Sequence, residues 1–223
     1  MTVKGPSAGF AGTCSALSAA VWVAQYLHAR VTHGPTSYNR ADVALGMTWF
    51  DSAKFLVLSF LLLVPAALAV GRRTAECGRP ASRPVAAVVV ALSASAVGTA
   101  LQFWPADWGS YAGTDAPSGP AYWGGPVQAV SSALLLPVAF AWLGVTAARA
   151  GALPWWLVPV LVVGGVTSAF LGGPLPPIPG IAWSVLGGWL LVVRSGEQRR
   201  PSPALTGEER PVWDNRRTAN EPP

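Results

Sequence analysis

The chain has 223 residues, of which 52% are hydrophobic and only 11% are charged. Soluble domains carry about 25% charged residues, so the composition argues against a soluble domain and indicates an integral membrane protein. The formal net charge of +5 does not indicate a nucleic-acid partner, because the basic residues lie in loops between apolar segments.

Six apolar segments have, or nearly have, the length of about 20 residues that a membrane-spanning helix needs. In chain order they cover residues 8–29, 49–70, 84–103, 126–147, 153–171 and 178–193. The last two are separated by residues 172–177, a run of glycine, proline and one leucine that cannot continue a helix. The first segment is longer than the apolar region of a signal peptide, which favours a retained helix over a cleaved one. The predicted fold is an all-α polytopic transmembrane bundle of six helices.

The distribution of lysine and arginine predicts the orientation of this bundle, since cytoplasmic loops are enriched in both residues. With the N-terminus inside, twelve of the fifteen basic residues fall on the cytoplasmic side and three on the outer side. Both ends are therefore predicted in the cytoplasm of a multi-pass protein of the cell membrane. Residues 1–194 are predicted to form the transmembrane domain. Residues 195–223 are polar and proline-rich, which predicts a disordered cytoplasmic tail.

Short sequence matches indicate an internal repeat. Residues 16–19 and 91–94 both read Ala-Leu-Ser-Ala, and similar leucine-proline runs occur at 61–66 and 134–139. Helices one-two and three-four would then be a duplicated hairpin, as occurs in transporters. Chance recurrence of alanine and leucine is the alternative.

Charged residues open the second apolar segment at the predicted outer edge of the hydrocarbon. Asp51 and Lys54 are three residues apart, so they share a helix face and can pair. The pair is a candidate site for a polar headgroup or a proton, with Asp51 as a general acid. The alternative is an interfacial pair that sets where the helix begins.

Further polar residues lie near the same predicted outer edge, namely Gln25, His28, Gln102 and Gln128. Each is a candidate ligand-binding residue, because a polar group inside a membrane bundle is costly unless it has a partner. Hydrogen bonds between helices are the structural alternative for each glutamine.

The loop between the third and fourth segments is rich in aromatic residues and acids and has no basic residue. Trp104, Trp108 and Trp123 offer aromatic faces that suit a cationic or amphipathic ligand, and Asp107 is a second candidate catalytic acid. The alternative is a belt of interfacial aromatic residues with solvated acids.

No metal site and no cofactor are predicted. Two cysteines and two histidines do not form a metal-ligand spacing. The chain also has no phosphate-binding loop or dinucleotide fingerprint.

The run at residues 64–69, the late Gly-Gly-Trp-Leu-Leu at 187–191 and the six short-looped helices resemble small, uncharacterised integral membrane proteins of high-GC actinobacteria. This resemblance implies a fold and a membrane location. It implies no activity and no functional residue.

The leading functional interpretation is an accessory membrane protein that binds a lipid or another hydrophobic small molecule near the outer leaflet. Membrane lipids are its expected partners, and an oligomer is left open. One alternative is an enzyme on a lipid or isoprenoid, of the cyclase or isomerase type, with Asp51 or Asp107 as its acid. Another is a small transporter subunit.

Overall fold

The computed structural model describes residues 6–33, 54–103, 120–169 and 177–198, and all of their regular structure is helical. This confirms the predicted all-α class. The helices are α1 (Ala8–His33), α3 (Leu56–Glu76), α4 (Ser82–Phe103), α5 (Pro120–Val130), η2 (Ser131–Leu135), α6 (Leu136–Arg149), α7 (Leu157–Thr167) and α8 (Ile178–Gln198). The π-helical turn η2 joins α5 to α6 without a break, so these elements form six helices.

Four of the six helices are long and apolar enough to cross a membrane. These stretches are Ala8–Leu27, Leu56–Glu76, Ser82–Gln102 and Trp123–Arg149. The shorter apolar helices are Leu157–Thr167 and Ile178–Val193. The fold is therefore compatible with a membrane protein, and six crossings remain a prediction.

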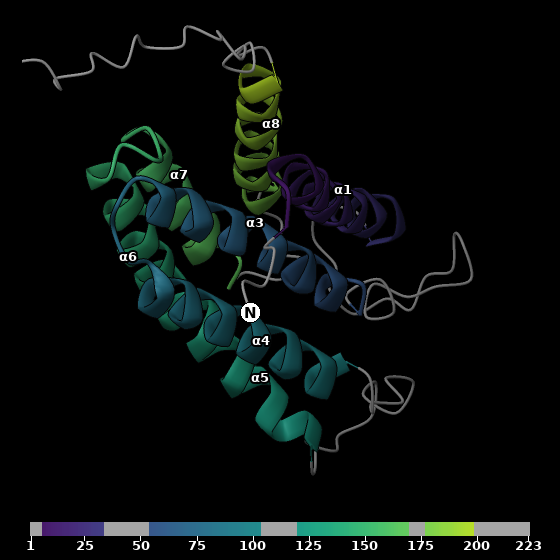
Figure 1. The fold of residues 1–223 in the computed structure, drawn as a ribbon. Coiled ribbons are helices and arrows are strands. Elements are labelled where there is room, and N and C mark those ends of the chain that lie inside the picture. Colours follow the sequence, from purple (N-terminus) through teal and green to yellow (C-terminus); the bar gives the residue numbers. More distant parts are fainter. Residues whose placement is uncertain (1–5, 34–53, 104–119, 170–176, 199–223) are drawn as a thin grey trace, which may run out of the picture.

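The helices pack in chain order and close into a ring (Figure 1). α1 packs on α3, α3 on α4, α4 on α5 and α6, α6 on α7, α7 on α8, and α8 returns to α1. Neighbours in the ring are antiparallel: Gly12 near the start of α1 meets Gly187 of α8, and Ala19 meets Gly180. One end of the bundle therefore holds the C-terminal ends of α1, α4 and α7 and the N-terminal ends of α3, α5 and α8. We call this end the distal end, and the opposite end the proximal end.

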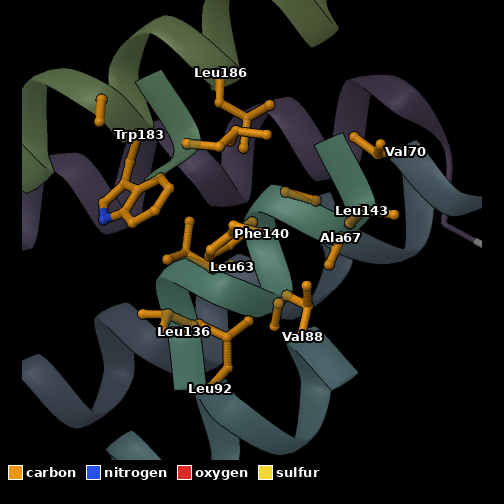
Figure 2. Close-up of a cluster of buried hydrophobic side chains, with 14 of the residues drawn as sticks. Leu63, Ala67, Val70, Val88, Leu92, Leu136, Phe140, Leu143, Trp183 and Leu186 are labelled. Carbon is orange, nitrogen blue, oxygen red and sulfur yellow. The ribbon is translucent and has the colours of Figure 1, made fainter. Parts of the chain in front are cut away.

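The centre of the ring is filled by large apolar side chains from four different helices (Figure 2). Leu63 of α3, Leu92 of α4, Phe140 of α6 and Trp183 of α8 are all buried there. Large apolar residues also cover the outside of the helices, for example Val90, Leu58 and Val192. A soluble bundle turns polar faces outward, so an apolar exterior fits an apolar solvent.

Two glycines allow α4 and α5 to approach until their backbones touch. A Cβ added to Gly98 would lie 2.7 Å from the Cα of Gln128, and one added to Gly124 would lie 2.7 Å from the Cα of Gln102. Small residues at helix interfaces are typical of membrane bundles. This close approach places the side chains of α4 directly against those of α5 and η2.

The helix boundaries differ from the predicted ones. The second helix begins at Leu56 rather than at residue 49, so Lys54 lies in the turn before it and not on the helix as predicted. It continues past residue 70 to Glu76, and its last turn carries an exposed Arg72–Glu76 ion pair with an N–O distance of 2.7 Å. The fourth helix begins at Pro120 rather than at residue 126. The fifth is shorter than predicted and ends at Thr167. The sixth begins at residue 178 as predicted and reaches Gln198. The remainder of the predicted tail lies outside the described residues.

Candidate functional site

Half of the predicted site residues lie outside the part of the chain whose side chains the structure describes. These are His28, Asp51, Trp104, Asp107 and Trp108. The pairing of Asp51 with Lys54 and the aromatic loop therefore stay predictions.

The other five predicted residues are all placed near the distal end. Gln25 of α1 and Gln128 of α5 are buried, with 3% and 4% of their surface exposed. Gln102 is half-buried near the end of α4, Lys54 is half-buried in the turn before α3, and Trp123 of α5 is 63% exposed. The ring does not bring the two buried glutamines together, because α1 and α5 are not neighbours in it.

Gln128 belongs to a closed circuit of buried hydrogen bonds that joins α4 to the π-helical turn. The Nε2 of Gln128 donates to the Oγ of Ser132 at 3.2 Å, and Ser132 donates to the Oγ of Ser95 at 3.1 Å. Ser95 donates to the Oγ of Ser131 at 3.1 Å, and Ser131 donates to the backbone oxygen of Gln128 at 3.0 Å. The same Nε2 lies 3.4 Å from the backbone oxygen of Ser168, at the end of α7. The serine circuit, as we call it, links three helices.

Every hydroxyl of the serine circuit both donates and accepts one hydrogen bond. All three hydroxyl groups therefore have hydrogen-bond partners within the protein, and the bonds of such a chain polarise one another in a low-dielectric interior. It also explains where η2 occurs, because both Ser131 and Ser132 must face α4. Gln128 therefore makes a hydrogen bond between helices, which was the structural alternative to ligand binding for each glutamine.

A second set of buried hydroxyls ties α1 to its two neighbours. The Oγ atoms of Ser18 in α1 and Ser59 in α3 are 2.7 Å apart, and Ser59 also lies 3.2 Å from the backbone oxygen of Ser18. Ser15 donates to the backbone oxygen of Trp183 at 2.8 Å. These bonds hold α3 and α8 against the same face of α1.

Three buried donors on uncharged side chains have no acceptor among the described residues. They are the Nε1 of Trp22, the Nε2 of Gln25 and the Nε1 of Trp183. All three side chains are at least nine-tenths buried. In Figure 2 the indole nitrogen of Trp183 lies on the side of the ring that faces away from Phe140. We call Trp22, Gln25 and Trp183 the donor trio.

The two tryptophans of the donor trio each pack against a phenylalanine ring. The ring centroids of Trp22 and Phe60 are 6.1 Å apart with the planes at 89°, an edge-to-face arrangement. Those of Phe140 and Trp183 are 5.2 Å apart with an angle of 36°. Four helices, α1, α3, α6 and α8, thus contribute aromatic side chains to the interior, and no charged side chain is fully buried in the described part of this region.

An unpaired buried donor is costly. Leaving an N–H group without an acceptor costs about 1–3 kcal/mol, and no solvent water reaches it in a hydrocarbon environment. The three donors of the donor trio are therefore destabilising as long as they have no acceptor, and the described residues provide none. The Oε1 of Gln102, a buried acceptor near the end of α4, is in the same situation but lies on the other side of the ring.

Sequence reasoning found Gln25 but missed Trp22 and Trp183. The available signal was spacing: Trp22 precedes Gln25 by three residues, so the two share one face of α1. Trp183 lies one and a half turns inside an apolar segment, deeper than an interfacial tryptophan usually lies.

In comparisons with protein-family models, curated proteins and solved structures, the chain matches none. The resemblance to actinobacterial membrane proteins stays a prediction.

Proposed function

We propose that this protein crosses the membrane six times, with both ends in the cytoplasm, and binds a lipid or another hydrophobic small molecule in the distal half of its bundle. The distal half then lies in the outer leaflet. The observation that carries the proposal is the donor trio, three buried N–H groups without an acceptor among the described residues.

The ring supports six crossings rather than four. α7 and α8 complete the ring between α6 and α1, and both expose large apolar residues such as Val163 and Ile181 on the outside. With α7 and α8 outside the membrane, these side chains would face water. Trp155 and Trp156, more than half exposed at the proximal start of α7, fit an interfacial position.

Exposed arginines support a cytoplasmic proximal end. Four exposed arginines lie there, at the end of α3, in the turn to α4, at the start of α4 and at the end of α6: Arg72, Arg79, Arg83 and Arg149. Arginine is enriched in cytoplasmic loops.

Reporter fusions test the topology. Fusions after Arg79 and Arg199 are expected to report cytoplasm, and fusions after Thr36 and Thr114 the outside. A cytoplasmic signal from the Thr114 fusion would contradict the six-span arrangement.

The residues near the donor trio support a ligand that is apolar with a small polar part. They are aromatic and aliphatic, and the three side chains of the donor trio are uncharged. A ligand that supplied acceptors to the donor trio would relieve the cost of burying them. The enzyme alternative places its acid on Asp51 or Asp107, which both lie outside the described residues, and the transporter alternative rests on the predicted internal repeat.

Photolabelling tests the binding proposal. The purified protein is labelled with a phosphatidylglycerol that carries a diazirine in one acyl chain, and the labelled peptides are mapped by mass spectrometry. We expect saturable labelling of α1, α3 and α8 in their distal halves, removed by an excess of unlabelled lipid. Labelling spread evenly over the apolar exterior, without saturation, would refute binding at this site.

A further inference from the structure

The outer surface of α4 carries a line of exposed apolar side chains that ends in an exposed arginine. Val97, Val90 and Arg83 follow one another at a spacing of seven residues, so they share one face of the helix. The two valines are 53% and 64% exposed. Because the apolar part of α4 begins at Ser82, the arginine lies at the proximal edge of that part. We call such a row of side chains an apolar line.

The helices that pack against α4 on either side repeat this pattern. On α6, Val138 and Trp142 are 60% and 49% exposed, and Trp142 precedes the exposed Arg149 by seven residues. On α3, Leu68 is 39% exposed and precedes Arg72 by four residues, so the two share a face. Three neighbouring helices therefore carry an apolar line, and all three lines end in an arginine at the proximal end of the bundle.

A phospholipid has the same two parts in the same order, an apolar chain and a charged headgroup. We propose that the proximal ends of α3, α4 and α6 bind anionic phospholipids of the inner leaflet, with the phosphate on an arginine and an acyl chain along the apolar line. Guanidinium groups form charge-assisted hydrogen bonds with phosphate oxygens, and anionic lipids give the cytoplasmic leaflet its negative potential. The proposal rests on the membrane orientation proposed above and is separate from the distal binding site.

The three arginines differ in how much of their charge is available to a lipid. Arg83 and Arg149 are exposed and have no ion-pair partner among the described residues. The Nε of Arg72 lies 2.7 Å from the Oε1 of Glu76, and this carboxylate repels a lipid phosphate. We therefore expect Arg72 to bind the lipid more weakly than the other two.

The remaining basic side chains that the structure describes do not end an apolar line. The guanidinium carbon of Arg73 lies over the ring of Trp189, 5.6 Å from its centroid. Arg79 is exposed in the turn between α3 and α4, and Lys54 is half-buried in the turn before α3. Among the described side chains, the combination of an apolar line with a terminal cation is therefore specific to α3, α4 and α6.

Native mass spectrometry of the delipidated full-length protein tests the proposal. Phosphatidylglycerol is compared with phosphatidylcholine of equal chain length, because the two lipids share the phosphate and the acyl chains and differ in net charge. The wild type is expected to bind phosphatidylglycerol about five-fold more tightly, which is the contribution of one arginine near an anionic membrane surface.

The variants Arg83→Gln and Arg149→Gln each remove one cation and keep a polar side chain. Each is expected to bind one phosphatidylglycerol fewer than the wild type at the same lipid concentration, with unchanged binding of phosphatidylcholine. The matched control is Arg30→Gln, since Arg30 lies near the distal end of α1. It should keep the wild-type preference. Arg79→Gln should have a smaller effect than Arg83→Gln, because Arg79 does not end an apolar line.

The variant Glu76→Gln tests the proposal in the opposite direction. It removes the negative charge beside Arg72 and leaves the arginine in place, so it should increase the binding of phosphatidylglycerol. A purely structural role of Arg72 would produce no such gain. Unchanged binding would therefore overturn the part of the proposal that concerns α3.

Thermal unfolding separates lipid binding from a structural role. Without lipid, Arg83→Gln and Arg149→Gln should unfold at the wild-type temperature, because both side chains are exposed. Phosphatidylglycerol should raise the melting temperature of the wild type more than phosphatidylcholine does. This difference should shrink at about 1 M salt, where the screening length is roughly 3 Å. Lower melting temperatures of the lipid-free variants would show that the arginines hold the fold and would contradict the proposal.

The outcomes separate this proposal from the distal binding site. Equal binding of the two lipids by the wild type overturns it, as does an Arg30→Gln variant that loses as much preference as Arg83→Gln. A dimer that binds neither lipid would assign the apolar lines to a second copy of the chain and overturn it as well. None of these results concerns the distal half, which photolabelling tests, and a failed photolabelling experiment leaves the proximal surface standing.

Discussion

The close contact between α4 and α5 predicts that a larger residue at Gly98 destabilises the protein. In the variant Gly98→Ala, the new methyl carbon would lie 2.7 Å from the Cα of Gln128 and 2.8 Å from its Cβ. Non-bonded carbon atoms prefer separations of about 3.5–4.0 Å. One of the two atoms is backbone, so it cannot rotate away, and the helices must separate by roughly 1 Å.

The expected loss of stability follows from this separation. It stretches the Ser132–Ser95 and Ser95–Ser131 hydrogen bonds, both now 3.1 Å, beyond hydrogen-bonding range. Two broken bonds cost about 1 kcal/mol each or more, and the overpacking itself costs about 1–3 kcal/mol. We expect Gly98→Ala to destabilise the protein by about 3–5 kcal/mol.

Thermal unfolding of the detergent-solubilised protein measures this effect. For a chain of this size 1 kcal/mol shifts the melting temperature by about 2–4 °C, so a decrease of roughly 6–20 °C is expected. Gly188→Ala on α8 is the matched control, since a Cβ there has no atom within 4 Å. It should be neutral or slightly stabilising, because alanine is the better helix former. A Gly98→Ala variant within about 2 °C of the wild type would refute the tight α4–α5 contact.

Four further changes test other parts of the fold. Ser95→Ala opens the serine circuit and leaves a buried hydroxyl without its acceptor, so it should lower the free energy of unfolding by about 1–3 kcal/mol, while Ser93→Ala, exposed on the same helix, should have no effect. Gly187→Ala would place its Cβ 2.8 Å from a backbone oxygen of α1 and should lower the melting temperature like Gly98→Ala. Arg72→Ala removes an ion pair whose side chains are about half exposed and should cost less than about 1 kcal/mol. Removal of residues 201–223 should leave thermal unfolding unchanged, because their composition predicts no buried surface.

The six helices were predictable because a membrane-spanning helix needs one long apolar run, which is a local property of the sequence. The start of α8 at Ile178 follows from the preceding proline-rich break. The C-terminal end of α3 and the start of α5 were less predictable. Arg72 and Arg73 mark the membrane edge, but a helix does not have to end there, and α3 continues with an ion pair in its last turn.

The candidate site was predictable only in part, because its interactions join distant segments. A glutamine within an apolar segment, such as Gln25 or Gln128, is visible in the sequence as a costly residue. Its partners are not visible. Ser95 is on another helix from Gln128, and the contact between α1 and α8 joins the first and last helices of the ring. The bonds of Ser131 and Ser132 to Ser95 of α4 are likewise not visible in the sequence.

The serine circuit and the donor trio differ in whether their buried donors have acceptors. Both are buried in the distal half, and Gln128 and Gln25 look equivalent in the sequence. In the serine circuit each donor has its acceptor, so a ligand there would have to break a cooperative set of bonds before it formed any. The three donors of the donor trio have no acceptor among the described residues. The buried polar groups on the α4–α5 side of the ring are therefore paired within the protein, whereas the buried donors on α1 and α8 are not.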